Sequence, residues 1–251
     1  MNKPKRIAFF GSDQIAIPVL NSLVSQPQSL EICGILTQPD RRSGRGNKLQ
    51  SNPIKQWALE SNVPVHDPQK PGMEEVCWLK ELGVEMVLIM AYGHILREEL
   101  LKVPSYGCFN LHASLLPKYR GASPIETALA MGEQKTGVTL MQVVPRMDAG
   151  PVVDVEIVPI EASDQGATLR HKIAEACVPL MARNLSSILD GSVRVQAQSE
   201  SEATYCRKLA KSDGRLNFNL TARELVLRNR AFVGWPGSYF EYENTILRVG
   251  R

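Results

Sequence analysis

The chain has 251 residues, of which 43% are hydrophobic and 22% are charged, a balance typical of a globular protein with one large domain and a smaller piece. Its five scattered cysteines, never in C-x-x-C spacing, exclude a disulfide or zinc framework and favour a reducing cytoplasm. The sequence shows no signal-peptide core and no apolar run long enough to span a bilayer. We therefore expect a cytoplasmic protein that is neither exported nor embedded in a membrane.

The net charge of +3 is distributed unevenly along the chain. Residues 37–55 contain five cations and one acid, and residues 203–251 contain nine cations and four acids. These two segments carry net charges of +4 and +5, so the rest of the chain carries −6. Positive charge gathered in two patches fits a polyanionic partner, although a solvated loop and a solvated helix face would give the same pattern.

The first third of the chain predicts the start of a parallel α/β sheet. An apolar run over 5–10 is followed by a helical apolar pattern over 15–24 and by a second apolar run over 30–36. Strand, helix, strand is the order in which such a sheet begins. The turn at Gly11 lacks the G-x-G-x-x-G glycines of a dinucleotide site, so we expect no dinucleotide cofactor.

Residues 37–52 are too long and too polar for a simple connection between two elements. Arginine is suited to holding phosphates and to stacking on bases, so this segment is a candidate nucleic-acid contact. A surface loop without a partner is the alternative. The cations that the segment offers are Arg41, Arg42, Arg45 and Lys48.

Beyond this segment, the sequence predicts a helix over 53–59, a short edge strand over 63–66 and an amphipathic helix over 73–82. The run over 85–91 is almost entirely apolar, which indicates a central strand buried on both faces. Open α/β sheets bind ligands at the carboxyl ends of their strands. The residues that follow this strand directly are Tyr92, Gly93, His94, Ile95 and Leu96.

The stretch from Gly107 to Gly150 contains the strongest chemical signal. Asn110 and His112 are two residues apart, so their side chains leave a strand on the same face, and Asp148 follows a second apolar run. Taken singly, each residue would more commonly be structural. Together, an amide, an imidazole and a carboxylate supply an oxyanion donor, a proton carrier and an orienting base, which suits acyl transfer to an amine.

An apolar loop separates Asn110 from Asp148. Loops are normally polar, so the run Ser114-Leu115-Leu116-Pro117 indicates a function beyond connection. The next residues predict a helix with Ser123 as its N-cap, Pro124 at its first position and Glu126 completing a capping box.

The run N-x-H-x-S-L-L-P-x-x-R-G, followed by Asp-Ala-Gly-Pro after the next apolar run, resembles the folate-dependent formyltransferases. The resemblance implies a Rossmann-like, mostly parallel sheet and transfer of a formyl group from 10-formyltetrahydrofolate, with no metal. It places Asn110, His112 and Asp148 on the catalytic positions of the family. The residues for which it implies folate contacts are Tyr92, Gly93, His94, Ile95, Leu96, Ser114, Leu115, Leu116, Pro117, Arg120 and Gly121.

The remainder of the chain predicts a strand over 152–160, a long helix over 168–189 and a polar linker over 190–202. Further on, Thr221 and Glu224 predict a capped helix, and 238–249 predict a hairpin that turns at Glu243 and Asn244. The predicted organisation is therefore a catalytic domain over 1–189, a linker over 190–202 and a separate region over 203–251.

Two segments further resemble the methionyl-tRNA formyltransferases of this family. The run T-Q-P-D-R-x-x-G-R-G-x-K-L resembles their inserted loop, and 203–251 resembles the start of their OB-like, tRNA-binding β-barrel. The resemblance implies methionyl initiator tRNA as the partner of a monomer, with acceptor-stem contacts from Arg41, Arg42, Arg45 and Lys48. Because these relatives run several dozen residues further, the barrel is expected to be incomplete, with exposed sheet edges.

Three other functions are compatible with the sequence. The formyl acceptor could be another amine such as an amino-sugar nucleotide, or the protein could hydrolyse the same folate to formate. A third alternative is a non-catalytic RNA-binding relative, although such a protein would not need Asn110, His112 and Asp148 together.

Overall fold

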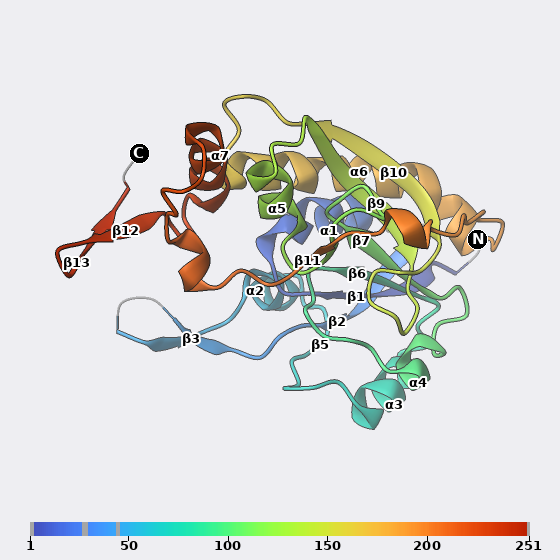
Figure 1. Cartoon of the computed structure of the whole chain (residues 1–251). Helices are drawn as coiled ribbons and strands as arrows, with labels where there is room; N and C mark the ends of the chain where they lie inside the picture. The colour runs from blue at the N-terminus through green and yellow to red at the C-terminus, as the bar shows by residue number, and fades with distance from the viewer. Residues whose placement is uncertain (1–2, 27–29, 44–45, 250–251) are drawn as a thin grey trace.

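A seven-stranded sheet forms the centre of the molecule in the computed structural model, which describes residues 3–26, 30–43 and 46–249 (Figure 1). The strand order is β10-β9-β7-β6-β1-β2-β5, and the pairs from β7 to β5 are parallel, whereas β9 and β10 are antiparallel additions. The strands are β1 (Lys5–Gly11), β2 (Leu30–Leu36), β5 (Val65–His66), β6 (Met86–Met90), β7 (Cys108–His112), β9 (Lys135–Gln142) and β10 (Val152–Pro159). The predicted mostly parallel sheet is confirmed, with the fully buried β6 at its centre.

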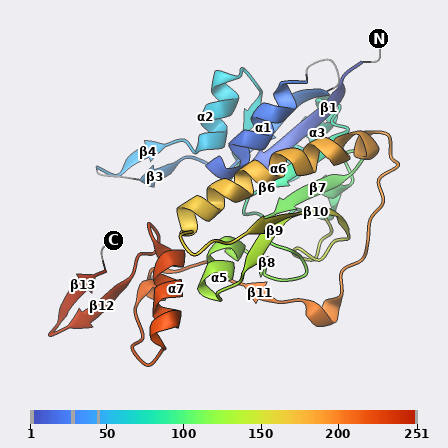
Figure 2. The ribbon, with the colours of Figure 1, turned by 90° about the horizontal axis from the view of Figure 1, so that it is seen from above.

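Helices cover both faces of the sheet because the strands bury side chains on both sides (Figures 1 and 2). On β1, Ile7 and Phe9 belong to one core cluster, whereas Ala8 and Phe10 belong to the other. The first cluster packs under α1 (Ile17–Val24), α2 (Pro53–Glu60), α5 (Pro124–Ala130) and α6 (Gly166–Leu189), and the second under α3 (Met73–Glu81) and α4 (Glu98–Leu101). Among the described residues, no helix combines the length and the hydropathy needed to cross a bilayer.

The predicted start of α5 is right in position and wrong in its capping contacts. Pro124 begins the helix, but the side chain of Ser123 makes no cap hydrogen bond. Its Oγ instead accepts from the backbone N–H of Leu209 at 3.3 Å, and Glu126 accepts from Arg170 at 3.2 Å. At α5, partners distant in sequence thus replace the local capping box. The capping box predicted at Thr221 does form, because the side chains of Thr221 and Glu224 are exposed to solvent and bond to their neighbours in sequence.

The long polar segment after β2 forms a hairpin of β3 (Arg41–Ser43) and β4 (Lys48–Gln50), which projects from the body of the molecule (Figures 1 and 2). Its base is fixed by Asn52, whose Oδ1 caps α2 and whose Nδ2 donates to the carbonyl of Gln38 at 2.8 Å. Lys55 adds ion pairs to Asp40 and Asp67.

The C-terminal region contains α7 (Ala222–Phe232) and the predicted hairpin, formed by β12 (Tyr239–Tyr242) and β13 (Thr245–Arg248). Helix α7 packs beside α5 (Figure 2) and buries Ala231 and Phe232 in the first core cluster. Within the described part of 203–251, the hairpin has only an isolated bridge from Arg215 as a further sheet partner. This part of the chain therefore holds no closed barrel.

Candidate active site

Strand β7 presents Asn110 and His112 on the same side, as predicted. Its alternate residues Phe109 and Leu111 point into the core cluster beneath α6. Asn110 and His112 therefore leave the strand on the opposite side. Asn110 is half-buried, and His112 is only 6% exposed, so the imidazole works in surroundings with little water.

The hydrogen bonds of His112 define which ring nitrogen receives a proton. Its Nε2 lies 3.0 Å from the carbonyl oxygen of Tyr119, which only accepts, so Nε2 must carry a hydrogen. Its Nδ1 lies 3.7 Å from Oδ2 of Asp148. In the neutral imidazole, Nδ1 is therefore the nitrogen with the free lone pair, and it faces the carboxylate of Asp148.

Asp148 lies in the turn between β9 and β10 and is held from outside the turn. Its Oδ2 accepts a hydrogen bond from the backbone N–H of Gly121 at 2.8 Å. Its φ of +48° lies in the left-handed region, which a non-glycine residue keeps only when surrounding contacts impose it. The structure thus brings Asp148 to His112, as expected. We refer to Asn110, His112 and Asp148, the residues that the sequence predicts to be catalytic, as the catalytic cluster.

The apolar loop after β7 is fixed through polar contacts that the sequence does not reveal. Ser114 is fully buried, and its Oγ donates to the carbonyl of Lys118 at 2.6 Å. The buried Thr139 on β9 donates to the carbonyl of Ser114 at 2.7 Å and accepts from the N–H of Leu116 at 3.0 Å. Leu115, Leu116 and Pro117 stay half-buried, so the loop offers a rigid, partly exposed apolar surface.

The stretch after β6 offers backbone groups and a neutral imidazole. Tyr92 is 2% exposed, and its carbonyl accepts from Gln38 at 2.8 Å. Gly93 and Ile95 are exposed, and Leu96 is buried. His94 is half-buried, with its Nε2 enclosed and without a partner among the described residues. Burial, and then the charges of Arg41 and Lys70, lower the pKa of His94, which keeps the ring neutral.

Arg120, for which the resemblance implies a folate contact, is fully buried and directed elsewhere. Its guanidinium donates to Oε1 of Gln198 at 2.8 and 3.1 Å and to the carboxylate of Glu200 at 2.9 and 3.2 Å. The next residue, Gly121, provides the N–H that holds Asp148. Arg120 therefore connects Gly121, which holds Asp148, to residues of the polar segment that the sequence predicts to be a linker.

That polar segment continues into a strand that borders the loop. β11 (Tyr205–Cys206) pairs in parallel with β8 (Arg120–Gly121), and the carbonyl of Thr204 accepts from the N–H of Arg120 at 2.8 Å. A Cβ on Gly121 would lie 2.0 Å from the carbonyl oxygen of Cys206, so only glycine permits this close approach. We refer to residues 198–206 as the bordering segment.

The cations predicted to bind tRNA lie on the β3–β4 hairpin. Arg41, Arg42 and Lys48 are exposed, and Arg45 lies outside the described residues. The hairpin and the C-terminal β12–β13 hairpin project on the same side of the molecule in both views (Figures 1 and 2). The two hairpins therefore flank one side of the protein, and the exposed cations Arg41, Arg42 and Lys48 lie on the first of them.

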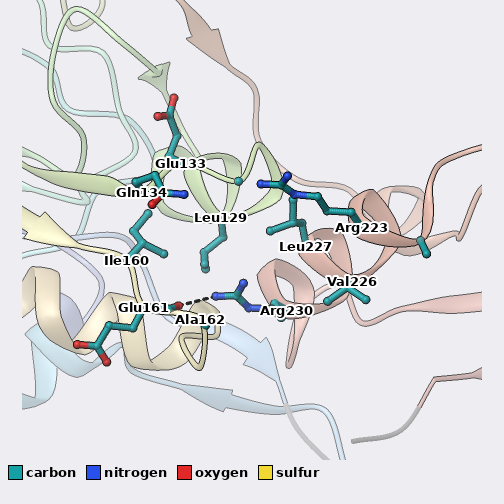
Figure 3. A pocket seen from close by; sticks show the side chains of 12 residues that line it. Leu129, Glu133, Gln134, Ile160, Glu161, Ala162, Arg223, Val226, Leu227 and Arg230 are labelled. Atoms are coloured by element: carbon teal, nitrogen blue, oxygen red, sulfur yellow. Dashed lines mark hydrogen bonds between the residues drawn. The ribbon is translucent and has the colours of Figure 1, made fainter.

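A cavity of about 500 Å³ lies between α5, α7 and the turn after β10 (Figure 3). Its apolar wall is formed by Leu129, Ile160 and Leu227. Its charged wall includes Arg230, which donates to the carbonyl of Glu161 at 2.7 Å. None of the predicted site residues lines it. This cavity is therefore separate from the catalytic cluster.

One group of possible metal ligands comes together that the sequence spacing does not indicate. Ligand atoms of His66, Glu74 and Glu75 lie within 4.8 Å of one another. Glu75 already accepts from the N–H of Gly72 at 2.6 Å, and His66 stacks on Trp78 with ring centroids 4.1 Å apart. Helix capping accounts for the position of Glu75, and aromatic packing accounts for that of His66.

Residues 5–185 match the family model described as formyl transferase, and the chain belongs to this family. More particularly, the chain is similar to proteins named methionyl-tRNA formyltransferase. That of Methylococcus capsulatus is 39% identical over 97% of this chain and 79% of its own length, and that of Hydrogenovibrio crunogenus is 36% identical over 99% and 80%. The solved 4-N formyltransferase of Francisella tularensis, at 16% identity, shares the fold, with a TM-score of 0.77 over 98% of this chain and 97% of its own.

Proposed function

We propose that this protein transfers the formyl group of 10-formyltetrahydrofolate to the α-amino group of methionyl initiator tRNA, giving N-formylmethionyl-tRNA. The observation that carries the chemistry is the approach of Asp148 to Nδ1 of His112 beside the rigid loop Ser114–Pro117. The names of the similar proteins and the exposed cations of the β3–β4 hairpin support tRNA as the carrier of the amine.

The reaction begins when the neutral amine attacks the formyl carbon, so that a C–N bond forms and the carbonyl electrons move to oxygen. Asn110 donates a hydrogen bond to this oxyanion, and one such donor is typically worth about 2.7 to 4 kcal/mol in the transition state. The amine proton passes to Nδ1 of His112, because Nε2 already donates to Tyr119.

Collapse of the intermediate returns the electrons from oxygen and breaks the bond between the formyl carbon and N10 of the folate. His112 gives its proton to that nitrogen as it leaves, so the imidazole ends the cycle neutral. Asp148 orients the ring and stabilises its transient positive charge. Such acid–base assistance typically contributes about 10² to 10⁴ in rate.

We also propose that the donor lies between the half-exposed apolar loop 115–117 and the stretch 92–96. The neutral His94 contacts the donor there without a chemical role. Arg120 supports this site from its buried position instead of touching the folate. We further propose that the protein acts as a monomer in the cytoplasm, where its five free cysteines stay reduced. In this proposal 1–189 is the catalytic domain, 190–202 the linker and 203–251 the start of the tRNA-binding region.

The deciding experiment incubates the whole chain with 10-formyltetrahydrofolate and either methionyl initiator tRNA or elongator methionyl-tRNA. We expect formyl transfer to the initiator, with the elongator as the poorer acceptor. Rapid formate release without any acceptor would identify a hydrolase, and transfer only to an amino-sugar nucleotide would identify a different acceptor. A folded protein that binds tRNA but transfers nothing would be the non-catalytic relative.

A further inference from the structure

Gln198, in the bordering segment, uses every donor and acceptor of its side-chain amide at the active site. Its Nε2 donates to the backbone carbonyls of Asp148 at 2.9 Å and of Gly150 at 2.7 Å. Its Oε1 accepts from two nitrogens of Arg120. Because a carbonyl only accepts and a guanidinium only donates, these partners also define which end of the amide is nitrogen.

These contacts hold Asp148 from two directions. Gln198 binds the backbone of Asp148 directly, which supports its left-handed φ of +48°. Gln198 also satisfies the buried charge of Arg120, which otherwise would be costly to enclose. Because Arg120 precedes Gly121, fixing Arg120 fixes the N–H that binds the Asp148 carboxylate at 2.8 Å.

We propose that Gln198 is a positioning residue for formyl transfer, which fixes the turn at Asp148 so that its carboxylate faces Nδ1 of His112. The inference rests on the proposed function. Gln198 lies 50 residues from Asp148 in the chain, and the bordering segment that carries it pairs with β8. Gln198 does not itself touch the reacting atoms.

The informative variant is Gln198→Glu. It keeps the size of the side chain and the contact with Arg120, now as an ion pair, but it removes the N–H donors and turns a carboxylate oxygen toward two carbonyls. We expect kcat to fall about tenfold to a hundredfold, as small displacements of catalytic groups do, with KM for both substrates within about twofold of the wild type. A purely structural role through Arg120 predicts an unchanged kcat.

Gln196→Ala is the matched control. Gln196 is the same residue type two positions earlier, its side chain is exposed, and its backbone alone pairs with Val152. We expect wild-type kcat, KM and melting temperature. If Gln198→Glu does not fold, Gln198→Asn keeps the amide on a shorter side chain, and the same loss of kcat is expected.

A double-mutant cycle with Asp148→Asn separates positioning from a general loss of structure. If Gln198 acts through Asp148, adding Gln198→Glu to Asp148→Asn lowers single-turnover rates by less than about twofold. If the effects of the two substitutions are fully additive, or if folded Gln198→Glu keeps the wild-type kcat, the positioning role of Gln198 is wrong and the proposed function still stands. Absence of formyl transfer by the wild type and by Gln196→Ala would overturn the proposed function itself.

Discussion

The catalytic cluster and the β3–β4 hairpin place their polar groups in opposite environments. His112 is 6% exposed and held by backbone atoms, whereas Arg41, Arg42 and Lys48 extend into solvent on a projecting hairpin. Buried groups act through exact geometry at short range, and exposed cations act through a field that salt screens. Changes in the cluster should therefore affect kcat, and changes in the hairpin should affect tRNA binding.

The largest effect is expected from Asp148→Asn. The amide keeps the shape of the side chain but removes the charge that stabilises protonated His112, so kcat should fall by about 10² to 10⁴, with little change in KM for tRNA. Steady-state formylation, with a melting curve to verify folding, measures this. Nearly wild-type turnover by a folded Asp148→Asn would show that the assigned roles are wrong.

Gly121→Ala tests whether the bordering segment belongs to the cluster. A Cβ there meets the carbonyl oxygen of Cys206 at 2.0 Å, and the φ of +121° disfavours a side chain, so β8 and β11 must separate. We expect about 1 to 3 kcal/mol of lost stability together with reduced kcat. Gly191→Ala is the control, because Gly191 also has a positive φ but open space around its Cβ position. Equal losses in the two variants would contradict the steric argument.

A smaller effect, and one of a different kind, is expected from Arg42→Ala in the hairpin. The loss of one phosphate contact should raise KM for methionyl-tRNA several-fold, leave kcat unchanged and reduce the salt dependence of binding by about one unit of slope. Lys80→Ala, at an exposed cation on α3, is the matched control. An equal rise in KM for both variants would indicate nonspecific attraction and remove the distinction between the hairpin and the rest of the surface.

The smallest effect concerns His94, where the hairpin influences the stretch after β6. Burial is the main cause that lowers the pKa of His94, and the charge of Arg41 lowers it further. Arg41→Gln should therefore raise this pKa without restoring the ordinary value, as followed by NMR titration of the ring, with Arg42→Gln as the control. An unchanged pKa in Arg41→Gln would separate the two regions.

The lowered pKa of His94 also makes the stability of the fold depend on pH. Because the folded protein binds a proton at His94 less readily than the unfolded chain, stability is lost as the pH falls below the ordinary histidine pKa and toward the folded one. The loss on acidification should be smaller in Arg41→Gln than in the wild type, as measured by denaturant unfolding at several pH values.

The local sequence was sufficient to predict the main strands and helices of the sheet and the shared side of Asn110 and His112. Burial on both faces requires the apolar run of β6, and the two-residue repeat of a strand places Asn110 and His112 on one side. The capping box at Thr221 and the turn at Glu243 and Asn244 likewise depend on neighbours in sequence, so they formed as predicted.

Only the tertiary structure decided how the cluster is supported. Ser123 and Glu126 do not form the predicted capping box, because Ser123 bonds to Leu209 and Glu126 bonds to Arg170, both distant in sequence. Arg120 is directed away from a ligand role because its buried charge needs Gln198 and Glu200. The polar segment 190–202 resembles a linker in the sequence, although Gln198 bonds to Asp148 and Arg120 in the structure. These partners lie 50 or more positions away in the chain, and such hydrogen bonds leave no periodic pattern in the sequence.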